Sequence, residues 1–174
     1  LQTSIDVTVS ARKTTTTVIG TTPALLPVRS LMVQTGRFLQ ESDMVSRKRI
    51  AVLGPVLATR MFRTPALALG RRMTINGRAF EVVGVLQPEG GIFGVDLDDR
   101  AYVPLTTAQQ LFNVNYASFI FVRARDAGSI PRAARETERI LLREHGEEDF
   151  TVLSQSQLLT SLNAILGILT IALS

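Results

Sequence analysis

Short runs in which hydrophobic and polar residues alternate fill much of the chain, and this pattern is typical of β-strands. In the first run, Ile5, Val7 and Val9 are separated by polar residues. Other runs consist largely of β-branched and aromatic residues, which favour strands. The pattern predicts strands at residues 1–9, 14–20, 48–53, 101–105, 118–124 and 149–153.

A β-hairpin is the sharpest local prediction. Asn76-Gly77 separates two strand-like runs, residues 71–75 and residues 78–86. Both turn residues tolerate the positive φ angles that a type I′ turn requires. We therefore expect these two runs to pair in antiparallel fashion.

Helices are predicted where a start signal precedes apolar residues at helical spacing. Pro55 suits the first position of a helix that extends to about Phe62. A second helix is expected to begin at Thr106 or Thr107 and to end near Phe112. Either Gln109 or Gln110 would complete a capping box with the first threonine, so two pairings are left open.

The longest predicted helix begins at Ser129 and Pro131 and ends at His145-Gly146. It lies between two predicted strands and forms a βαβ-like unit with them. Since strands and helices alternate along the chain, the predicted fold class is α+β.

The C-terminal segment has a different pattern. From Leu162 to Leu173 the only polar side chains are Asn163 and Thr170, and the apolar residues surround the helix on all sides. Such a helix is either deeply buried or lipid-bound. Residues 158–174 are interpreted as the start of a transmembrane helix, preceded by a capping box of Ser154 and Gln157. Its expected membrane-entry residues are Leu162, Ile165, Leu166, Ile168, Leu169 and Ile171.

A core helix of a soluble domain is the alternative interpretation of this segment, because a run of this length can also be buried in protein. A core helix would need a large apolar groove on the rest of the domain. A membrane helix would need none.

Composition narrows the function classes. The chain has 174 residues, of which 45% are hydrophobic and 20% charged, as in a folded globular protein. The net charge of +4 is scattered in short clusters, so no nucleic-acid surface is predicted. The sequence contains no cysteine, which excludes disulfides and cysteine nucleophiles.

Few residues could support catalysis or metal binding. The single histidine, His145, is expected to have a structural role in the last turn of a helix. The glycine-bearing loop at residues 88–94 lacks the lysine and the serine or threonine of a phosphate-binding loop. Asp96, Asp98 and Asp99 could converge on a calcium ion or serve a hydrolase, but a solvated acidic turn is the simpler interpretation.

Four arginines line part of the longest predicted helix and could face anionic headgroups or an acidic partner. Glutamates are interspersed among them, so a solvated face is the favoured interpretation. The arginines are Arg132, Arg135, Arg139 and Arg143.

Several short motifs occur in a fixed order along the chain. They are Gly20-Thr21-Thr22-Pro23, Gly36-Arg37-Phe38 with Asp43, Arg49-Ile50-Ala51-Val52-Leu53-Gly54, Met61-Phe62, Ile75-Asn76-Gly77 with Phe80 and Val83-Gly84-Val85, and Tyr102-Val103-Pro104-Leu105 with Ala108. Their order is more specific than any single piece. From about Val18 to the C-terminus it resembles the MacB-like periplasmic core domain of ABC-transporter permeases. A proline that usually lies two residues before Gly70 in that family is replaced by Ala68.

This resemblance implies a two-lobed fold. One lobe, a split β-α-β (porter-like) lobe, would comprise residues 1–35 and 117–157. A β-rich lobe at residues 36–116 would be inserted into it, and the membrane helix would follow at 158–174. The domain would lie outside the cytoplasm, periplasmic or extracellular, between two helices of a multi-pass cell-membrane protein.

The resemblance also implies a function, namely mechanical coupling of ATP-driven helix movements to export or to an extracytoplasmic partner. ATP would be bound by a separate cytoplasmic ABC ATPase, and no cofactor is expected in this chain. Further expected partners are a second permease copy or paired permease, an extracytoplasmic adaptor or effector, and the lipid bilayer. A ligand-binding sensor is the main alternative, and a hydrolase is a remote one.

Overall fold

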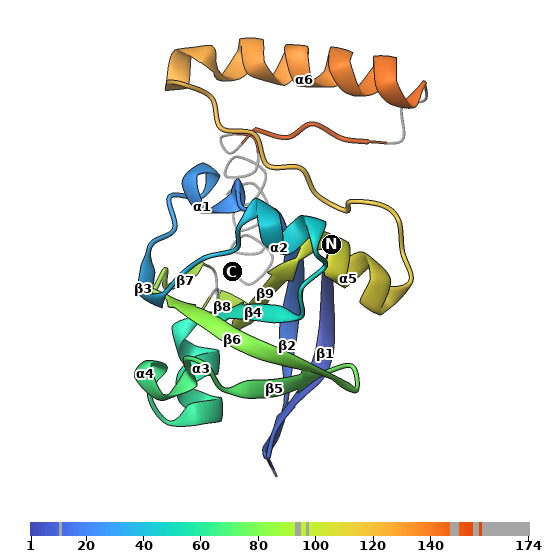
Figure 1. Cartoon of the computed structure of the whole chain (residues 1–174). Helices are drawn as coiled ribbons and strands as arrows, with labels where there is room; N and C mark the ends of the chain where they lie inside the picture. The colour runs from blue at the N-terminus through green and yellow to red at the C-terminus, as the bar shows by residue number, and fades with distance from the viewer. Residues whose placement is uncertain (11, 93–94, 97, 147–149, 155–156, 158–174) are drawn as a thin grey trace, which may run out of the picture. The chain divides into compact units, whose positions relative to one another are not determined.

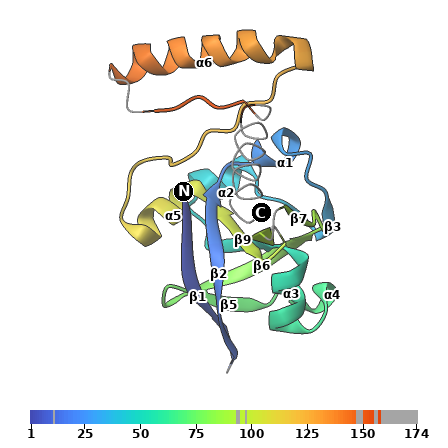
Figure 2. The same ribbon diagram turned by 180° about the vertical axis from the view of Figure 1, so that it is seen from behind.

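The computed structural model describes residues 1–10, 12–92, 95–96, 98–146, 150–154 and 157 (Figures 1 and 2). Helices and strands are mixed, which confirms the predicted α+β content. The chain divides into two compact units, Leu1–Val122 and Arg123–Ser174, which are described separately below.

The first unit contains nine strands and five helices among its described residues. The strands are β1 (Gln2–Val9), β2 (Arg12–Thr21), β3 (Val33–Gly36), β4 (Ile50–Leu53), β5 (Arg72–Ile75), β6 (Arg78–Leu86), β7 (Gly91–Ile92), β8 (Val95–Asp96) and β9 (Arg100–Pro104). The helices are α1 (Leu25–Val28), α2 (Glu41–Val45), α3 (Pro55–Phe62), α4 (Pro65–Ala68) and α5 (Leu105–Phe112).

Seven of these strands form one sheet, in the order β3-β6-β4-β9-β2-β1-β5. Because β5 also pairs with β6, the sheet closes on itself in a ring that contains every one of its strands except β3. Figures 1 and 2 show α3 and α4 together beside β5 and β6, and α2 and α5 close together toward the other end of the sheet. Strands β7 and β8 form a separate two-stranded ladder.

Strand β6 is the junction of the sheet. One of its edges pairs in parallel with β4, and the other is shared by β5 and β3, both antiparallel. Against β4 the register moves from Val82 to Gly84, so Val83 is an extra residue in the ladder. Such a bulge bends a strand and increases its twist, and here it lies where the partner on the shared edge changes from β5 to β3.

Two glycines permit the close crossing at this bulge. A Cβ at Gly84 would lie 2.1 Å from the carbonyl oxygen of Arg37, and a Cβ at Gly36 would lie 2.3 Å from that of Val83. Gly36 also has a φ of +76°. The Arg37 N–H donates to the Val83 carbonyl at 2.9 Å. The backbone of β3 can therefore approach β6 only because neither residue has a side chain.

The predicted hairpin is confirmed. Strands β5 and β6 pair from Arg72 with Glu81 to Ile75 with Arg78. Asn76 and Gly77 have φ angles of 47° and 73°, as a type I′ turn requires. Helix α3 is also confirmed, with Pro55 at its start.

Apolar side chains cover both faces of the central strands, which explains why all four residues of β4 are buried. Ala51 and Leu53 of β4 belong to a large cluster with Leu57 of α3 and Ala108 of α5. The other two residues of β4, Ile50 and Val52, belong to a second cluster. Its buried members are Leu31, Phe38, Leu39, Ile50, Val52, Leu86 and Tyr102.

The predicted caps of α5 are wrong. Its N-cap is Pro104, and no side chain caps it. The Thr106 hydroxyl instead donates to the Met44 carbonyl at 2.7 Å, and the Thr107 hydroxyl donates to that of Lys48 at 3.0 Å. Both threonines thus attach α5 to the segment between α2 and β4, because those carbonyls lie within reach once the helix packs there.

The N-terminal strands belong to the sheet of the first unit. Strands β1, β2 and β3 join the same sheet as the strands of residues 36–116. The lobe of residues 1–35 and 117–157 stays a prediction. Strand β1 pairs with β2 along its whole length, and β2 pairs in parallel with β9. These backbone ladders bind the N-terminal residues to the rest of the first unit.

The second unit contains the 3-10 turn η1 (Ala127–Ser129) and helix α6 (Ile130–His145). Gly146, in the left-handed conformation, ends α6 as predicted. Ser129 is the N-cap of α6, as predicted, but its side chain makes no capping hydrogen bond. Asp126 caps the preceding η1 turn, where its carboxylate accepts a hydrogen bond from the Ser129 N–H at 2.8 Å. The half-buried side of α6 consists of Ile130, Ala133, Ala134, Thr137, Leu141 and Leu142.

The strands predicted at residues 118–124 and 149–153 are not assigned as strands where the structure describes them. Phe119, Ile120, Phe121 and Val122 remain 53–64% exposed. Their composition favours a strand, but no segment among the described residues forms a ladder with them. Strand structure requires a hydrogen-bonded partner, which a composition signal cannot supply.

Substituting Gly84→Ala is expected to destabilise the first unit by about 2 kcal/mol or more, because the new methyl group meets the Arg37 backbone and neither can move alone. Glu81→Ala, on an exposed position of the same strand, is the matched control and should change stability by less than about 0.5 kcal/mol. Urea unfolding followed by circular dichroism measures both. Equal midpoints for the two variants would contradict the close crossing of β3 and β6.

Candidate functional site

The predicted membrane-entry residues, from Leu162 to Ile171, lie outside the described residues. The capping box just before them is confirmed: the Ser154 N–H donates to the Gln157 Oε1 at 2.9 Å, and the Gln157 N–H donates to the Ser154 hydroxyl at 3.3 Å. Among the described residues no helix combines the length and hydrophobicity of a membrane span.

The acidic loop is a structural anchor. Asp98 is only 7% exposed, and its carboxylate accepts hydrogen bonds from the N–H groups of Glu89 and Gly90 at 2.7 and 3.0 Å. Asp99 forms an ion pair with Arg60 and accepts a hydrogen bond from the Thr16 hydroxyl. These bonds occupy the carboxylates that a calcium ion or a hydrolase would need.

The solvated-turn interpretation is also wrong for Asp98. A Cβ on Gly54 would lie 2.1 Å from the Asp98 carbonyl oxygen, so the turn before α3 packs directly against this backbone. The Asp96 side chain lies outside the described structure. No group of three metal-ligating side chains occurs in the part of the chain that the structure describes.

The arginines of α6 lie on an exposed face. Arg132 pairs with Glu136 at 2.8 Å, and Arg143 pairs with Glu144 at 3.2 Å. Arg135 and Arg139 are also exposed. This agrees with a solvated, mixed-charge helix face. The backbone of His145 ends the helix, and its side chain lies outside the described structure.

A cluster of ion pairs surrounds Asp43, which is fully buried, whereas the side chains of Arg37 and Lys48 are partly exposed. Arg37 donates to both carboxylate oxygens of Asp43, at 2.6 and 3.2 Å, and the Lys48 ammonium lies 3.2 Å away. The Gln40 N–H donates to the same carboxylate at 2.9 Å within a capping box at the start of α2. The Gly-Arg-Phe…Asp motif is thus a structural clamp between β3 and α2.

Opposing effects act on the pKa of the Asp43 carboxyl. Burial alone would raise it. Hydrogen bonds from Arg37, from the Gln40 N–H and from Lys48 outweigh this effect, so the pKa of Asp43 lies below its ordinary value. The carboxylate therefore remains ionised and keeps α2 attached at neutral pH.

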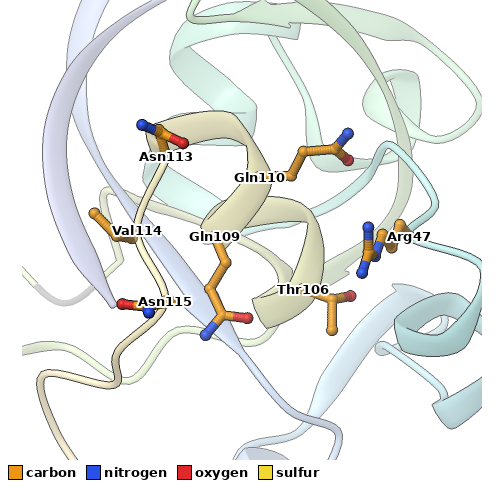
Figure 3. A pocket seen from close by; sticks show the side chains of 7 residues that line it. All are labelled: Arg47, Thr106, Gln109, Gln110, Asn113, Val114 and Asn115. Carbon is orange, nitrogen blue, oxygen red and sulfur yellow. The ribbon is translucent and has the colours of Figure 1, made fainter.

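An open depression of about 500 Å³ lies beside α5 (Figure 3). Thr106 and Gln109 come from the helix, and Arg47 comes from the turn after α2. In Figure 3 the side chain of Gln109 lies between those of Asn115 and Thr106. The complete lining is mainly polar and consists of Arg47, Thr106, Gln109, Gln110, Asn113, Val114 and Asn115.

Arg29, just after α1, connects two other segments of the first unit. Its guanidinium lies 3.3 Å from the Glu89 carboxylate and 5.6 Å from the centre of the Phe121 ring. Burial raises the pKa of the Glu89 carboxyl, the charge of Arg29 opposes this, and the charge of Asp98 adds to it. A cation–π contact between Arg29 and Phe121 thereby attaches the exposed apolar segment at residues 119–122 to the rest of the first unit.

The charged residues described in the first unit serve mainly to hold loops and helices together. Asp43, Asp98 and Asp99 all have partners within the chain. The amide-lined depression was not predicted, although the sequence signal was present in the four carboxamides between Gln109 and Asn115. The spacing of those residues alone could not show that they border one surface.

Comparison with known proteins places these features in a family. Residues 2–140 match the MacB-like periplasmic core domain. A macrolide export ATP-binding/permease protein, MacB of Rhodospirillum rubrum, is 31% identical over 160 residues, which cover 91% of this chain and 25% of that protein. The chain therefore spans about a quarter of the length of this relative.

Two solved structures have a similar fold. The extracellular domain of the noncanonical ABC-type transporter YknZ from Gram-positive bacteria is 26% identical, with a TM-score of 0.73, and the match covers 88% of this chain and 78% of that one. The periplasmic region of MacB from Actinobacillus actinomycetemcomitans is 19% identical, with a TM-score of 0.74, over 93% of this chain and 72% of that one.

Replacing the buried carboxylate with Asp43→Asn should lower the free energy of unfolding by about 2 kcal/mol at pH 7, because two cations lose their partner. Asp6→Asn, which removes an exposed ion pair with Lys13, is the control and should have little effect.

The same variant has a pH signature. Since the pKa of Asp43 is lowered by folding, its stabilising contribution is complete above the unfolded-state pKa of about 3.9 and is lost as the pH falls through the folded-state pKa. Urea unfolding at pH values from 7 to 3 should show the difference from the unmodified protein narrowing below about pH 4. A difference that stays constant over this range would contradict the assignment.

Calcium is expected to leave the melting temperature unchanged, because the Asp98 carboxylate is already bonded to two backbone N–H groups. Asp98→Ala should lower the melting temperature equally with and without calcium, since it releases the segment at Glu89 and Gly90. Thermal unfolding at millimolar calcium tests both statements. A rise in melting temperature that is lost in Asp98→Ala would instead show a calcium site.

Proposed function

This chain belongs to the MacB-like periplasmic core domain family, and from this premise we propose that it is the extracytoplasmic domain of an ABC-transporter permease that couples ATP-driven movement of membrane helices to export or to an extracytoplasmic partner. The observation that carries the proposal is the family match, which covers nearly all of the first compact unit and extends into the second. ATP binding and hydrolysis are assigned to a separate cytoplasmic ABC ATPase domain or chain.

The division into two units supports a mechanical role. The first unit is a closed sheet with apolar cores on both faces, and the second is built around α6. Two compact bodies joined at Val122 and Arg123 can move relative to each other while each keeps its own contacts. Rigid-body displacement of this kind is a common form of switching.

We further propose that residues 158–174 begin a membrane helix of a multi-pass permease. The capping box of Ser154 and Gln157 supports a helix start immediately before this apolar run. Such a helix would transmit movement from the bilayer to the second unit. The permease would act as a homodimer or paired with another permease, as the family resemblance implies.

The exposed apolar segment at residues 119–122 supports the split β-α-β lobe. It is apolar on both sides of the backbone, as in a strand covered on both faces. We propose that in the whole permease this segment forms a strand that pairs with a neighbouring strand.

An enzyme or a sensor for an apolar small molecule has less support. Asp98 and Asp99, two of the three acidic residues that a hydrolase could use, are engaged in structural bonds. Small-molecule sites are usually concave and largely apolar, whereas the depression beside α5 is lined mainly by amide side chains. These features favour a domain that acts through movement and contacts with other proteins.

A flexible insertion between the two units tests the coupling. Adding about eight Gly and Ser residues between Val122 and Arg123 of the intact permease should reduce export at least about tenfold and leave ATP hydrolysis by the ATPase intact, because a flexible linker does not transmit displacement. The cargo assayed is a compound that cells with the unmodified permease export and cells without it do not, with a macrolide tested first.

The matched control places the same insertion between Asn76 and Gly77, in the exposed turn of the hairpin. This variant should export normally, since the turn lies within one unit. Full export by the Val122–Arg123 insertion, with normal ATP hydrolysis, would refute mechanical coupling across this junction.

A further inference from the structure

The depression beside α5 presents four carboxamide groups that the fold does not use. Among the described residues, no side-chain hydrogen bond involves Gln109, Gln110, Asn113 or Asn115. Each carboxamide offers both N–H donors and a carbonyl acceptor. A surface of this kind has unused hydrogen-bonding capacity of both types in one place.

The backbone around the depression is firmly held. Helix α5 ends at Asn113 in the left-handed conformation, with a φ of 54°, and the Val114 N–H then donates to the Gln109 carbonyl at 3.0 Å. This bond folds residues 113–115 back beside the helix. The backbone that carries these groups is therefore fixed before a ligand binds, which reduces the entropy lost on binding.

The opposite wall is fixed by other bonds. Arg47 lies in a turn with a φ of 47°, and the next residue, Lys48, donates its N–H to the Asp43 carbonyl at 3.0 Å. The hydroxyls of Thr106 and Thr107 attach the same segment to α5. Since Asp43 is itself clamped by Arg37, the position of Arg47 follows from the ion pairs around Asp43.

The chemistry of the lining selects among ligand classes. Val114 is the one apolar side chain in it, so an apolar small molecule would find little surface to bury. Arg47 is the one cation, whereas nucleic acids and anionic membranes are bound by several. A polypeptide backbone carries one N–H and one C=O at almost every residue, which carboxamides can bond in alternation.

We propose that this depression is a docking site for an extended peptide segment of a protein partner. Gln109 and Asn115 bond the main chain of the segment, and Arg47 receives a carboxylate, either an acidic side chain or a C-terminus. The identity of the partner as an extracytoplasmic protein rests on the proposed function, but the recognition of an extended acidic peptide rests on the geometry alone.

Peptide selection against the intact permease in detergent tests the site. The probe is a phage-displayed library of random peptides of about twelve residues, and each selected peptide is then synthesised and titrated by fluorescence anisotropy. Gln109→Ala combined with Asn115→Ala should weaken binding at least about tenfold, through the loss of several main-chain hydrogen bonds. Arg47→Ala should weaken acidic peptides more than their amidated, neutral counterparts.

Gln34→Ala is the matched control, since it removes an exposed carboxamide from β3, outside the depression. It should leave affinity unchanged, and circular dichroism should show all variants folded. Asn113 is left intact because its left-handed backbone would strain most substitutes.

Three results would overturn the proposal: no enriched peptide, peptides insensitive to the double variant, or displacement of the selected peptides by the oligosaccharide maltotriose, which would indicate a sugar site. Peptide binding is measured without transport. Normal binding with unimpaired export in the linker insertion would therefore refute only the coupling function, and absent binding with impaired export would refute only the docking site.

Discussion

Strand β6 pairs with three neighbours and is bulged at Val83, and this junction organises the first unit. The extra residue Val83 bends the strand where its partner changes from β5 to β3. At this bend the backbones of Gly36 and Gly84 lie too close for any Cβ. The crossing delivers Arg37 to one fixed place, from which its guanidinium reaches Asp43.

From Asp43 the order extends to the surface. Its carboxylate begins α2 through the capping box and binds Lys48 at the far end of the same short segment. The carbonyls of Met44 and Lys48 then accept the two threonine hydroxyls of α5. A series of short polar contacts thus links a bulge in the sheet to the placement of the amide-lined depression.

Local signals predicted those parts of the fold that depend on local chemistry. Asn76-Gly77 and Pro55 act through their own backbone preferences, so the hairpin and α3 agree with the sequence. Thr106 and Thr107 do not follow the capping rule, because carbonyls from a distant segment compete for their hydroxyls. Asp98 became buried for a similar reason, since its partners are amides that only the folded loop brings near.

The candidate site could be predicted less well. The family motif identified Gly36, Arg37 and Asp43 as a group, but their role as a clamp required the observed bidentate ion pair. Likewise, Gln109 and Asn115 are separated in sequence by a helix end, and only the fold-back at Asn113 places them on one surface. The β-branched and aromatic composition of residues 118–124 predicted a strand but could not supply its partner.

The picture that emerges is a domain whose charges stabilise its own architecture and whose function lies in movement and contact. The measurement that tests this most directly is the distance between the two units during the ATP cycle. Because residues 1–174 contain no cysteine, spin labels can be placed in this domain through Arg78→Cys in the first unit and Glu138→Cys in the second, after any cysteine elsewhere in the permease has been replaced. Arg78→Cys and Val45→Cys form the pair within one unit. In the intact, exporting permease, double electron–electron resonance should show a changed distance between the spin labels of the two units when ATP binds. The distance between the two labels within the first unit should stay unchanged. Identical distributions between the units with and without ATP would contradict the coupling role.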